Sequence, residues 1–260
     1  MIRVCIAGAT GWVGRSLVQA VTSADDLRLS SAVSRSAAGK PLEEAPEVPI
    51  YATVTEALDE VDVLVDYTAH DVVRQHTMLA LERGIDVVIG TSGLTAEDFD
   101  EIDALARTQE AGVVAAGNFS LTAALAQAAA LLVAPFLPQN EVIDYASSTK
   151  PDVPSGTARE LAERLAAARP PLKDRELGDT SGPIEARGAT VDGVQVHSLR
   201  LPSFSVSTEV VFGLEHERLT IRHDADSSPD PYVEGTLLAI RGVGSRVGLT
   251  RGLDTLLFER

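Results

Sequence analysis

The chain has 260 residues, which is enough for one large domain or two modest ones with their own cores. Hydrophobic residues make up 45% of the sequence and charged residues 23%, as in ordinary globular proteins. The formal net charge of −16 argues against nucleic acid or an anionic membrane as a partner, because the field repels phosphate. An anionic ligand therefore needs a local positive pocket.

The single cysteine, Cys5, excludes an internal disulfide, and its apolar neighbours predict an inert buried thiol. The longest apolar stretch, residues 121–137, is interrupted by Gln127 and Pro135, so we interpret it as a buried helix rather than a membrane span. The N-terminus opens into a strand pattern without the features of a signal peptide. We therefore expect a cytoplasmic protein.

Up to about residue 120, short apolar strands alternate with helices. Strands are predicted at 2–7, 27–33, 61–66, 85–90 and 112–117. Helices are predicted at 13–23, at about 71–84 and from Thr95, where Thr95 and Asp98 form a capping-box pattern. Apolar strands that are joined by helices indicate a parallel sheet covered on both faces. The fold predicted here is α/β, with a doubly wound parallel sheet.

After a helix at 120–134 the pattern changes. Strands are predicted at 141–146, 194–200, 208–213 and 218–224, the last three with the alternation typical of antiparallel sheets. A helix at 157–169 opens with a capping box of Thr157 and Glu160, and a final helix at 231–243 precedes a short tail. We therefore predict a second, α+β domain with a mixed or antiparallel sheet.

Three glycines, Gly8, Gly11 and Gly14, stand at the junction of the first strand and the first helix. Glycine there permits a tight turn, a close approach of backbone N–H groups to a pyrophosphate, and packing of the helix on the strand. The place of this GxxGxxG string favours a Rossmann-type dinucleotide site over a purely structural turn. Arg15 follows and offers positive charge.

The second strand ends at Ser34-Arg35-Ser36. NAD-selective sites place a carboxylate here for the ribose 2′-hydroxyl, whereas an arginine accommodates a 2′-phosphate. No acidic residue occurs between Leu27 and Leu42. Arg35 therefore favours NADP(H), with NAD(H) as the alternative cofactor; the competing interpretation is an exposed loop arginine.

Three more strands end in small polar loops. These loops are Asp66-Tyr67-Thr68, Gly90-Thr91-Ser92-Gly93 and Gly117-Asn118-Phe119-Ser120. Because ligands of open parallel sheets lie at the carboxyl ends of the strands, we expect all three loops to line the path of the cofactor.

The segment from Lys150 to Thr157, KPDVPSGT, stands just ahead of a predicted helix. The helix start offers free N–H groups, Ser155 and Thr157 offer hydroxyls, and Lys150 offers a compact cation. This combination suits a carboxylate. A capped helix after a proline-rich loop with a surface lysine explains the same residues equally well.

Together these motifs resemble the dihydrodipicolinate reductase family over nearly the full length. The likeness is carried by IRVCIAGATGWVGR, DYT, IGTSGL, GNFS, KPDVPSGTA, VHSLRLP, EVVFG and LTIRHD. A short-chain dehydrogenase would need a Tyr-x-x-x-Lys pair, and Tyr145 and Lys150 are five residues apart. A semialdehyde dehydrogenase would need a thiol nucleophile, and only Cys5 in the first strand is available.

The resemblance implies hydride transfer from NAD(P)H to a cyclic, imine-like dicarboxylate, in a homotetramer joined through the C-terminal sheets and without a metal. It implies a discontinuous nucleotide domain of residues 1–120 and 231–260, with residues 121–230 for substrate binding and oligomerisation. The substrate carboxylate would be held by Lys150, also the candidate catalytic residue, and by Ser155, Gly156 and Thr157. The cofactor would contact residues of the motifs above, namely Gly8, Thr10, Gly11, Trp12, Val13, Gly14, Arg15, Ser34, Arg35, Thr68, Gly90, Thr91, Ser92, Asn118 and Phe119.

One departure from the family bears on the chemistry. The family carries two adjacent histidines shortly before its lysine, one a proton donor and the other a substrate contact, and here Ala146 and Ser147 stand at those positions. A further family histidine before EVVFG is also replaced. Neither alanine nor an ordinary serine acts as a general acid at neutral pH. The proton would then come from Lys150, from water or from the iminium of the substrate; we interpret His197 and His223 as structural hydrogen-bonding residues.

Three functions follow from these observations. They are the family reaction with a replacement acid, the reduction of a different cyclic imine or imino acid, and a non-catalytic NADP-binding sensor. An iminium that is already protonated needs no acid, and a sensor needs no carboxylate receptor. We therefore favour an active imine reductase whose substrate differs from that of the family.

Overall fold

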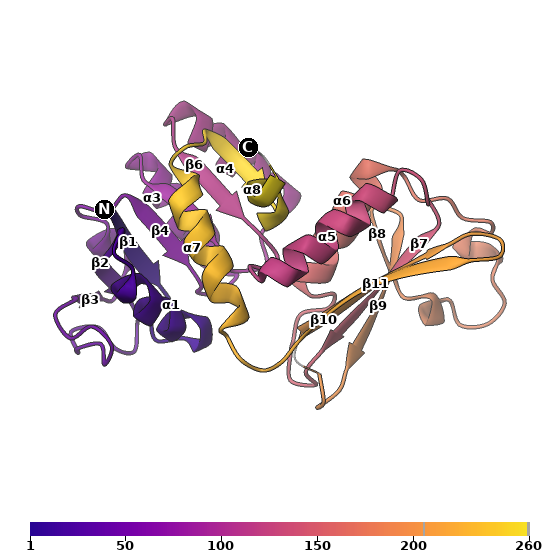
Figure 1. Cartoon of the computed structure of the whole chain (residues 1–260), viewed down its shortest axis with the longest axis horizontal. Coiled ribbons are helices and arrows are strands. Elements are labelled where there is room, and N and C mark those ends of the chain that lie inside the picture. Colours follow the sequence, from indigo (N-terminus) through magenta and orange to yellow (C-terminus); the bar gives the residue numbers. More distant parts are fainter. Residues whose placement is uncertain (205, 259–260) are drawn as a thin grey trace. The chain divides into compact units, whose positions relative to one another are not determined.

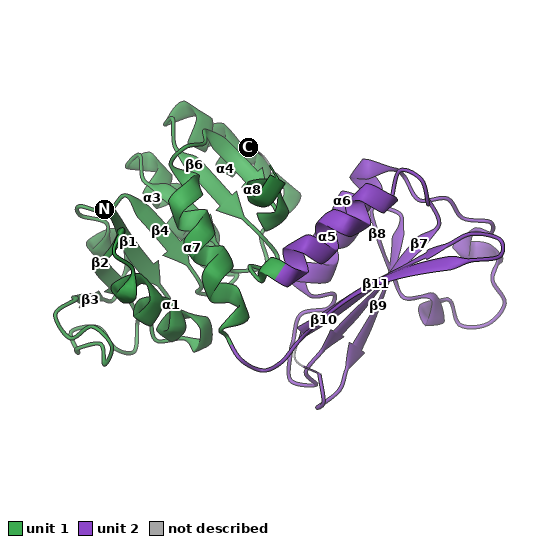
Figure 2. Ribbon diagram, viewed as in Figure 1, with its two compact units in different colours: residues 1–121, 229–260 green, residues 122–228 purple. Residues whose placement is uncertain are grey.

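The computed structural model describes residues 1–204 and 206–258. The chain forms two compact units, the first made of Met1–Leu121 and Pro229–Arg260 and the second of Thr122–Ser228 (Figure 2). The assignment of one unit to the nucleotide and the other to substrate and oligomerisation stays a prediction.

The first unit is built on a parallel sheet of seven strands in the order β12-β6-β5-β4-β1-β2-β3 (Figure 1). The strands are β1 (Ile2–Ala7), β2 (Leu27–Val33), β3 (Ile50–Tyr51), β4 (Val63–Asp66), β5 (Asp86–Ile89), β6 (Gly112–Ala115) and β12 (Gly248–Arg251). The chain runs from β1 outward to β2 and β3, then returns to the other side of β1 with β4. This reversal confirms the predicted doubly wound sheet, and ligands of such sheets lie at the point of reversal.

Helices cover both faces of this sheet. They are α1 (Trp12–Ser23), α2 (Val54–Ala57), α3 (Val73–Glu82), α4 (Ala96–Thr108), α7 (Pro231–Val243) and α8 (Leu253–Phe258). Helix α1 packs against α7, and α3 packs against α4 on the opposite face (Figure 1). The capping box of α4 is confirmed, because Thr95 Oγ1 accepts from Asp98 N at 3.2 Å and Asp98 Oδ2 accepts from Thr95 N at 2.9 Å.

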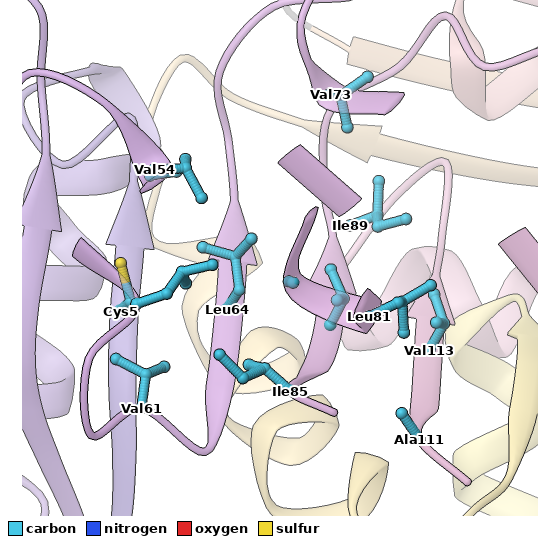
Figure 3. Packing of buried hydrophobic residues seen from close by; sticks show 14 of the residues in the cluster. Cys5, Val54, Val61, Leu64, Val73, Leu81, Ile85, Ile89, Ala111 and Val113 are labelled. Atoms are coloured by element: carbon cyan, nitrogen blue, oxygen red, sulfur yellow. The ribbon is translucent and has the colours of Figure 1, made fainter. Parts of the chain in front are cut away.

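Alternate residues of the buried strands point toward α2, α3 and α4 and form one hydrophobic cluster (Figure 3). In this cluster Cys5 and Leu64 from the strands pack with Leu81 from α3. Cys5 is fully buried, and the loss of hydration raises the pKa of its thiol to about 12. The thiol is therefore protonated and inert at neutral pH, as predicted.

The second unit has a mixed sheet in the order β11-β10-β7-β9-β8, which confirms the predicted type of sheet. Its strands are β7 (Asn140–Ala146), β8 (Ala189–Val191), β9 (Val194–Arg200), β10 (Val206–Gly213) and β11 (Arg218–Ala225). Helices α5 (Leu121–Val133) and α6 (Gly156–Ala168) pack on one face, where Val142, Phe212 and Leu165 are fully buried. Two short 3₁₀ turns, η1 (Leu177–Asp179) and η2 (Ile184–Arg187), lie between α6 and β8.

Strand β9 pairs antiparallel with β8, as its alternation predicted, and parallel with β7 on its other side. Two local predictions were wrong. The N-cap of α6 is Ser155 and not Thr157, and Glu160 is buried and accepts from Gln127 Nε2 at 2.9 Å instead of closing a capping box. The supposed tail contains β12, which extends the first sheet beside β6, and α8. Among the helices of the described part of the chain, none is long and apolar enough to cross a membrane.

Candidate functional site

The glycine turn between β1 and α1 brings backbone atoms very close together. Gly8 adopts φ +86°, in the left-handed region, and a Cβ on it would lie 2.3 Å from the carbonyl oxygen of Tyr67. A Cβ on Gly14 would lie 2.1 Å from the carbonyl oxygen of Gly8. Gly11 is the N-cap of α1 and has no side chain to cap the helix. The first N–H groups of α1 therefore lie at the reversal point of the sheet, where a pyrophosphate can accept their hydrogen bonds.

The end of β2 is tied to this turn by hydroxyl groups. Thr10 Oγ1 lies 2.7 Å from Ser34 Oγ, and Ser34 is buried. Arg35 follows as an exposed residue, and Arg15 is exposed with its Nε 3.3 Å from the carbonyl oxygen of Thr10. Neither guanidinium is committed to a carboxylate among the described ion pairs. Both cations therefore remain available to a phosphate.

Two of the remaining cofactor loops meet at one buried carboxylate. Asp66, the last residue of β4, is fully buried. Its Oδ1 accepts from Thr68 Oγ1 at 2.6 Å, from Thr68 N at 3.0 Å and from Thr91 Oγ1 at 2.7 Å. Its Oδ2 lies 2.8 Å from His76 Nδ1 on α3. The predicted residues Thr68 and Thr91 are thus brought together by Asp66, which the sequence analysis placed in a cofactor loop without giving its side chain a role of its own.

The other predicted cofactor residues differ in exposure and in the contacts that their side chains already make. Trp12 is 54% exposed and packs edge-on against Tyr232, with ring centroids 5.8 Å apart. Gly90 lies over the ring of Tyr67, which leaves no room for a Cβ. Asn118 Oδ1 accepts from Ser120 N at 2.8 Å. The ring of Phe119 is buried in the core, so any contact of this residue with a cofactor must come from its backbone.

Of the rest, Val13 is half-buried at the start of α1 and Ser92 is exposed in the loop after β5.

The candidate carboxylate receptor lies in the second unit. Ser155 Oγ accepts from Ala158 N at 3.3 Å and so caps α6, while Gly156 and Thr157 form the first turn of that helix. Lys150 Nζ lies 2.9 Å from Asp152 Oδ1. A substrate carboxylate at Lys150 therefore competes with Asp152, or shares the ammonium group with it, as an ammonium with three donors permits.

A buried ion pair that the sequence did not reveal supports this receptor. Asp144 on β7 is fully buried, and its carboxylate accepts from Ser155 N at 2.8 Å and from Ser155 Oγ at 2.7 Å. Arg200 Nη2 on β9 donates to Asp144 Oδ2 at 2.7 Å and to the carbonyl oxygen of Asp152 at 2.8 Å. The pair thus connects two strands to both ends of the loop that carries the receptor. The only prior signal was that Arg200 lies within the VHSLRLP motif.

The positions that lack histidine offer no acid in the described structure. Ala146 is fully buried at the end of β7, and Ser147 Oγ lies 3.0 Å from Thr149 Oγ1. His197 Nε2 lies 2.6 Å from Glu141 Oε2, and His223 Nε2 lies 3.0 Å from Thr122 Oγ1. Burial lowers the pKa of His223, which disfavours a proton donor there.

A parallel sheet that reverses direction beside a glycine turn, with polar loops at the carboxyl ends of its strands, defines a Rossmann-type dinucleotide-binding protein. Residues 2–119 match the family model "Dihydrodipicolinate reductase, N-terminus", and residues 118–257 match "Dihydrodipicolinate reductase, C-terminus". The chain belongs to the dihydrodipicolinate reductase family, as its motifs predicted. It is accordingly an oxidoreductase that uses NAD(P)H.

Individual proteins agree with the family models. A 4-hydroxy-tetrahydrodipicolinate reductase of Mycobacterium sp. (strain KMS) is 39% identical over 257 residues, covering 98% of this chain and 99% of that protein. That of Geobacillus thermodenitrificans (strain NG80-2) is 36% identical over 263 residues, with the same two coverages, 98% and 99%. The structure of dipicolinate-bound dihydrodipicolinate reductase from Paenisporosarcina sp. TG-14 superposes with a TM-score of 0.77 at 32% identity, covering 98% of this chain and 99% of that one.

Proposed function

We propose that the protein reduces the C=N bond of a small cyclic imine that carries a carboxylate, and that this substrate differs from that of its relatives. The proposal is supported by the capped start of α6 with Lys150 in the loop before it, which we interpret as a carboxylate receptor, beside Ala146 and Ser147 at the positions of the family's histidine pair. Ala146 is fully buried and has no titratable group. A substrate that arrives as a protonated iminium needs no acid at these positions.

In this reaction the nicotinamide supplies a hydride to the iminium carbon, and the electron pair of the C=N bond becomes the lone pair of the product amine. No further proton is needed to reach the neutral amine. Lys150 and the first turn of α6 hold the carboxylate, and the Asp144–Arg200 pair holds that turn in place. Gly8, Gly11 and Gly14 admit the pyrophosphate to the start of α1.

The second candidate is the reaction for which the relatives are named, the reduction of 4-hydroxy-tetrahydrodipicolinate. Full-length identities of 36% and 39% favour it. The proton would then come from Lys150 or from water. A sensor without turnover is the third candidate, and the intact receptor counts against it.

Two further proposals follow from the family. We propose a cytoplasmic homotetramer joined through the sheets of the second unit. In support of this, helices α5 and α6 pack on one face of the sheet, whereas Tyr145, Glu209 and Arg222 form a polar and aromatic cluster around β7, β10 and β11.

The experiment is to follow NADPH oxidation with 4-hydroxy-tetrahydrodipicolinate and with a panel of five- and six-membered cyclic imino acids. The proposal predicts a higher kcat/KM for a member of the panel. A higher kcat/KM for 4-hydroxy-tetrahydrodipicolinate supports the second candidate instead. Oxidation of NADPH by none of them, with NADPH bound, supports the sensor.

A further inference from the structure

Asp66 lies where the strand order of the first sheet reverses, because β4 is the neighbour of β1 on the returning side. Its carboxylate is fully buried. It receives three hydrogen bonds on Oδ1 from the loops after β4 and β5, through Thr68 and Thr91. These are two of the loops that we assign to the cofactor. A single side chain thus holds two loops of the site that follow different strands.

We propose that Asp66 is a positioning residue for NAD(P)H, which fixes the Thr68 and Thr91 loops in the arrangement that the bound cofactor requires. The two loops also contact each other directly, since Thr68 N donates to Thr91 Oγ1 at 2.8 Å. The hydroxyl groups of Thr68 and Thr91 both have Asp66 as acceptor, Thr68 through Oδ1 and Thr91 through Oδ1 or the carbonyl oxygen at 3.2 Å. The cofactor therefore meets backbone groups of these loops rather than hydroxyl hydrogens, and Asp66 acts through the loops without touching it.

The burial of this carboxylate explains why it can hold the loops firmly. A buried charge destabilises the folded protein unless it is hydrogen-bonded or paired. A movement of either loop that breaks its hydrogen bonds to Asp66 therefore raises the free energy of the folded state, which keeps both loops in place. The remaining partner of this carboxylate is His76, whose Nδ1 lies 2.8 Å from Asp66 Oδ2. His76 is on α3, so the carboxylate also ties both loops to a helix. Residues that contact a ligand are commonly held in position by hydrogen bonds to a second set of residues whose own side chains are fixed.

The test uses the binding of NADPH, and so it does not depend on the identity of the imine substrate. Asp66→Leu keeps the branched shape of the side chain, with larger methyl groups, and removes every hydrogen-bond acceptor. We expect the dissociation constant of NADPH to rise about tenfold or more, since misplaced binding groups cost up to about a hundredfold. Asp66→Asn keeps a carbonyl oxygen for the three donors, and its new NH2 group can donate to His76 Nδ1. We expect this variant to bind within about threefold of the original protein.

A matched control is Asp62→Leu. Asp62 directly precedes β4, at the opposite end of the strand from Asp66, and pairs with Arg3, where its side chain is 40% exposed. The Asp62→Leu variant should bind NADPH with a dissociation constant within about twofold of that of the original protein, since exposed ion pairs contribute little to stability. Nucleotide fluorescence measures the affinity, and circular dichroism confirms that each variant is folded. Steady-state kinetics should show KM for NADPH rising by a larger factor than kcat falls.

Three results would overturn the proposal. A folded Asp66→Leu protein that binds NADPH within twofold of the original shows that the loops need no such support. Equal losses of NADPH affinity in Asp66→Asn and Asp66→Leu show that the negative charge of Asp66 is required, and not its hydrogen-bond acceptors. If Asp66→Leu does not fold, the Thr68→Val, Thr91→Val double variant replaces it, and unchanged affinity in that protein refutes the proposal.

Discussion

Replacing Arg200 with methionine tests whether the buried ion pair stabilises the second unit. The Arg200 side chain is 15% exposed, its partner Asp144 is fully buried, and their nitrogen and oxygen atoms are 2.7 Å apart. Removing one partner of a buried pair costs about 3–5 kcal/mol, because the other charge stays buried without compensation. Asp144 keeps three neutral donors, from Ser155 N, Ser155 Oγ and Ser198 Oγ. We therefore expect Arg200→Met to lower the free energy of unfolding by about 3 kcal/mol, the lower end of that range.

Urea unfolding followed by circular dichroism measures this loss. The double variant Asp144→Asn, Arg200→Met should recover at least about half of it, since the amide removes the uncompensated charge and still accepts from Ser155. Arg222→Met is a matched control on β11, where the arginine is 41% exposed, and it should cost less than about 1 kcal/mol. A loss below about 1 kcal/mol for Arg200→Met, or no recovery in the double variant, would refute the reasoning.

Three further changes test the two sites and the pH dependence of stability. Lys150→Ala should lower kcat/KM for the carboxylate substrate by about ten- to a hundredfold and leave NADPH affinity unchanged in a fluorescence titration. Arg35→Ala should weaken NADPH binding but not NADH binding in the same titration, and equal effects on both would contradict the NADP preference. Burial lowers the pKa of His223, so the unfolded chain binds more protons below about pH 6.5 and stability falls as the pH decreases through that value. Between pH 7 and 5.5 the urea midpoint of His223→Gln should fall less than that of the unmodified protein. An equal fall in the two proteins would show that His223 is not the cause of the pH dependence.

The sheet of the first unit could be predicted because its strands are continuous apolar runs. Residues such as Val4, Ile6 and Leu64 are fully buried, and a strand that is buried on both faces has no polar alternation. The tail was missed for the opposite reason. Strand β12 reads Gly-Leu-Thr-Arg, with one large apolar residue, and its pairing with β6 depends on a partner more than 130 residues away. The local sequence pattern of a strand does not show which distant strand it will pair with.

The same limit explains what was missed at the site. Asp144 and Arg200 are 56 residues apart, and either looks like an ordinary surface charge in sequence. The cap of α6 was misplaced because Ser155 and Thr157 are both good N-caps, and the hydrogen bonds of Ser155 to the buried Asp144 on the preceding strand favour Ser155. The parallel pairing of β9 with β7 could not be predicted, because alternation reports which face of a strand is buried and not how each neighbouring strand runs.

Restoring the family histidines separates the two proposed reactions, and the structure makes the two positions unequal. Ala146 is fully buried between Val206 of β10 and Arg200 of β9, so Ala146→His forces an imidazole into a packed site and should cost about 1–3 kcal/mol or more. Ser147 is half-buried, and Ser147→His should fold normally.

If the native substrate is a protonated cyclic imine, neither variant should raise its turnover, since no acid is required at these positions. If the protein performs the reaction for which its relatives are named, general acid catalysis contributes about 10²–10⁴-fold, and a folded variant with the restored acid should gain part of that factor on 4-hydroxy-tetrahydrodipicolinate. Steady-state turnover of both single variants and the double variant on both substrates decides between these outcomes, with urea midpoints to show which proteins are folded. High turnover of 4-hydroxy-tetrahydrodipicolinate by the unmodified protein would contradict the altered substrate. Because Ala146 and Ser147 cannot donate it, the proton would then have to reach the product from Lys150 or from water.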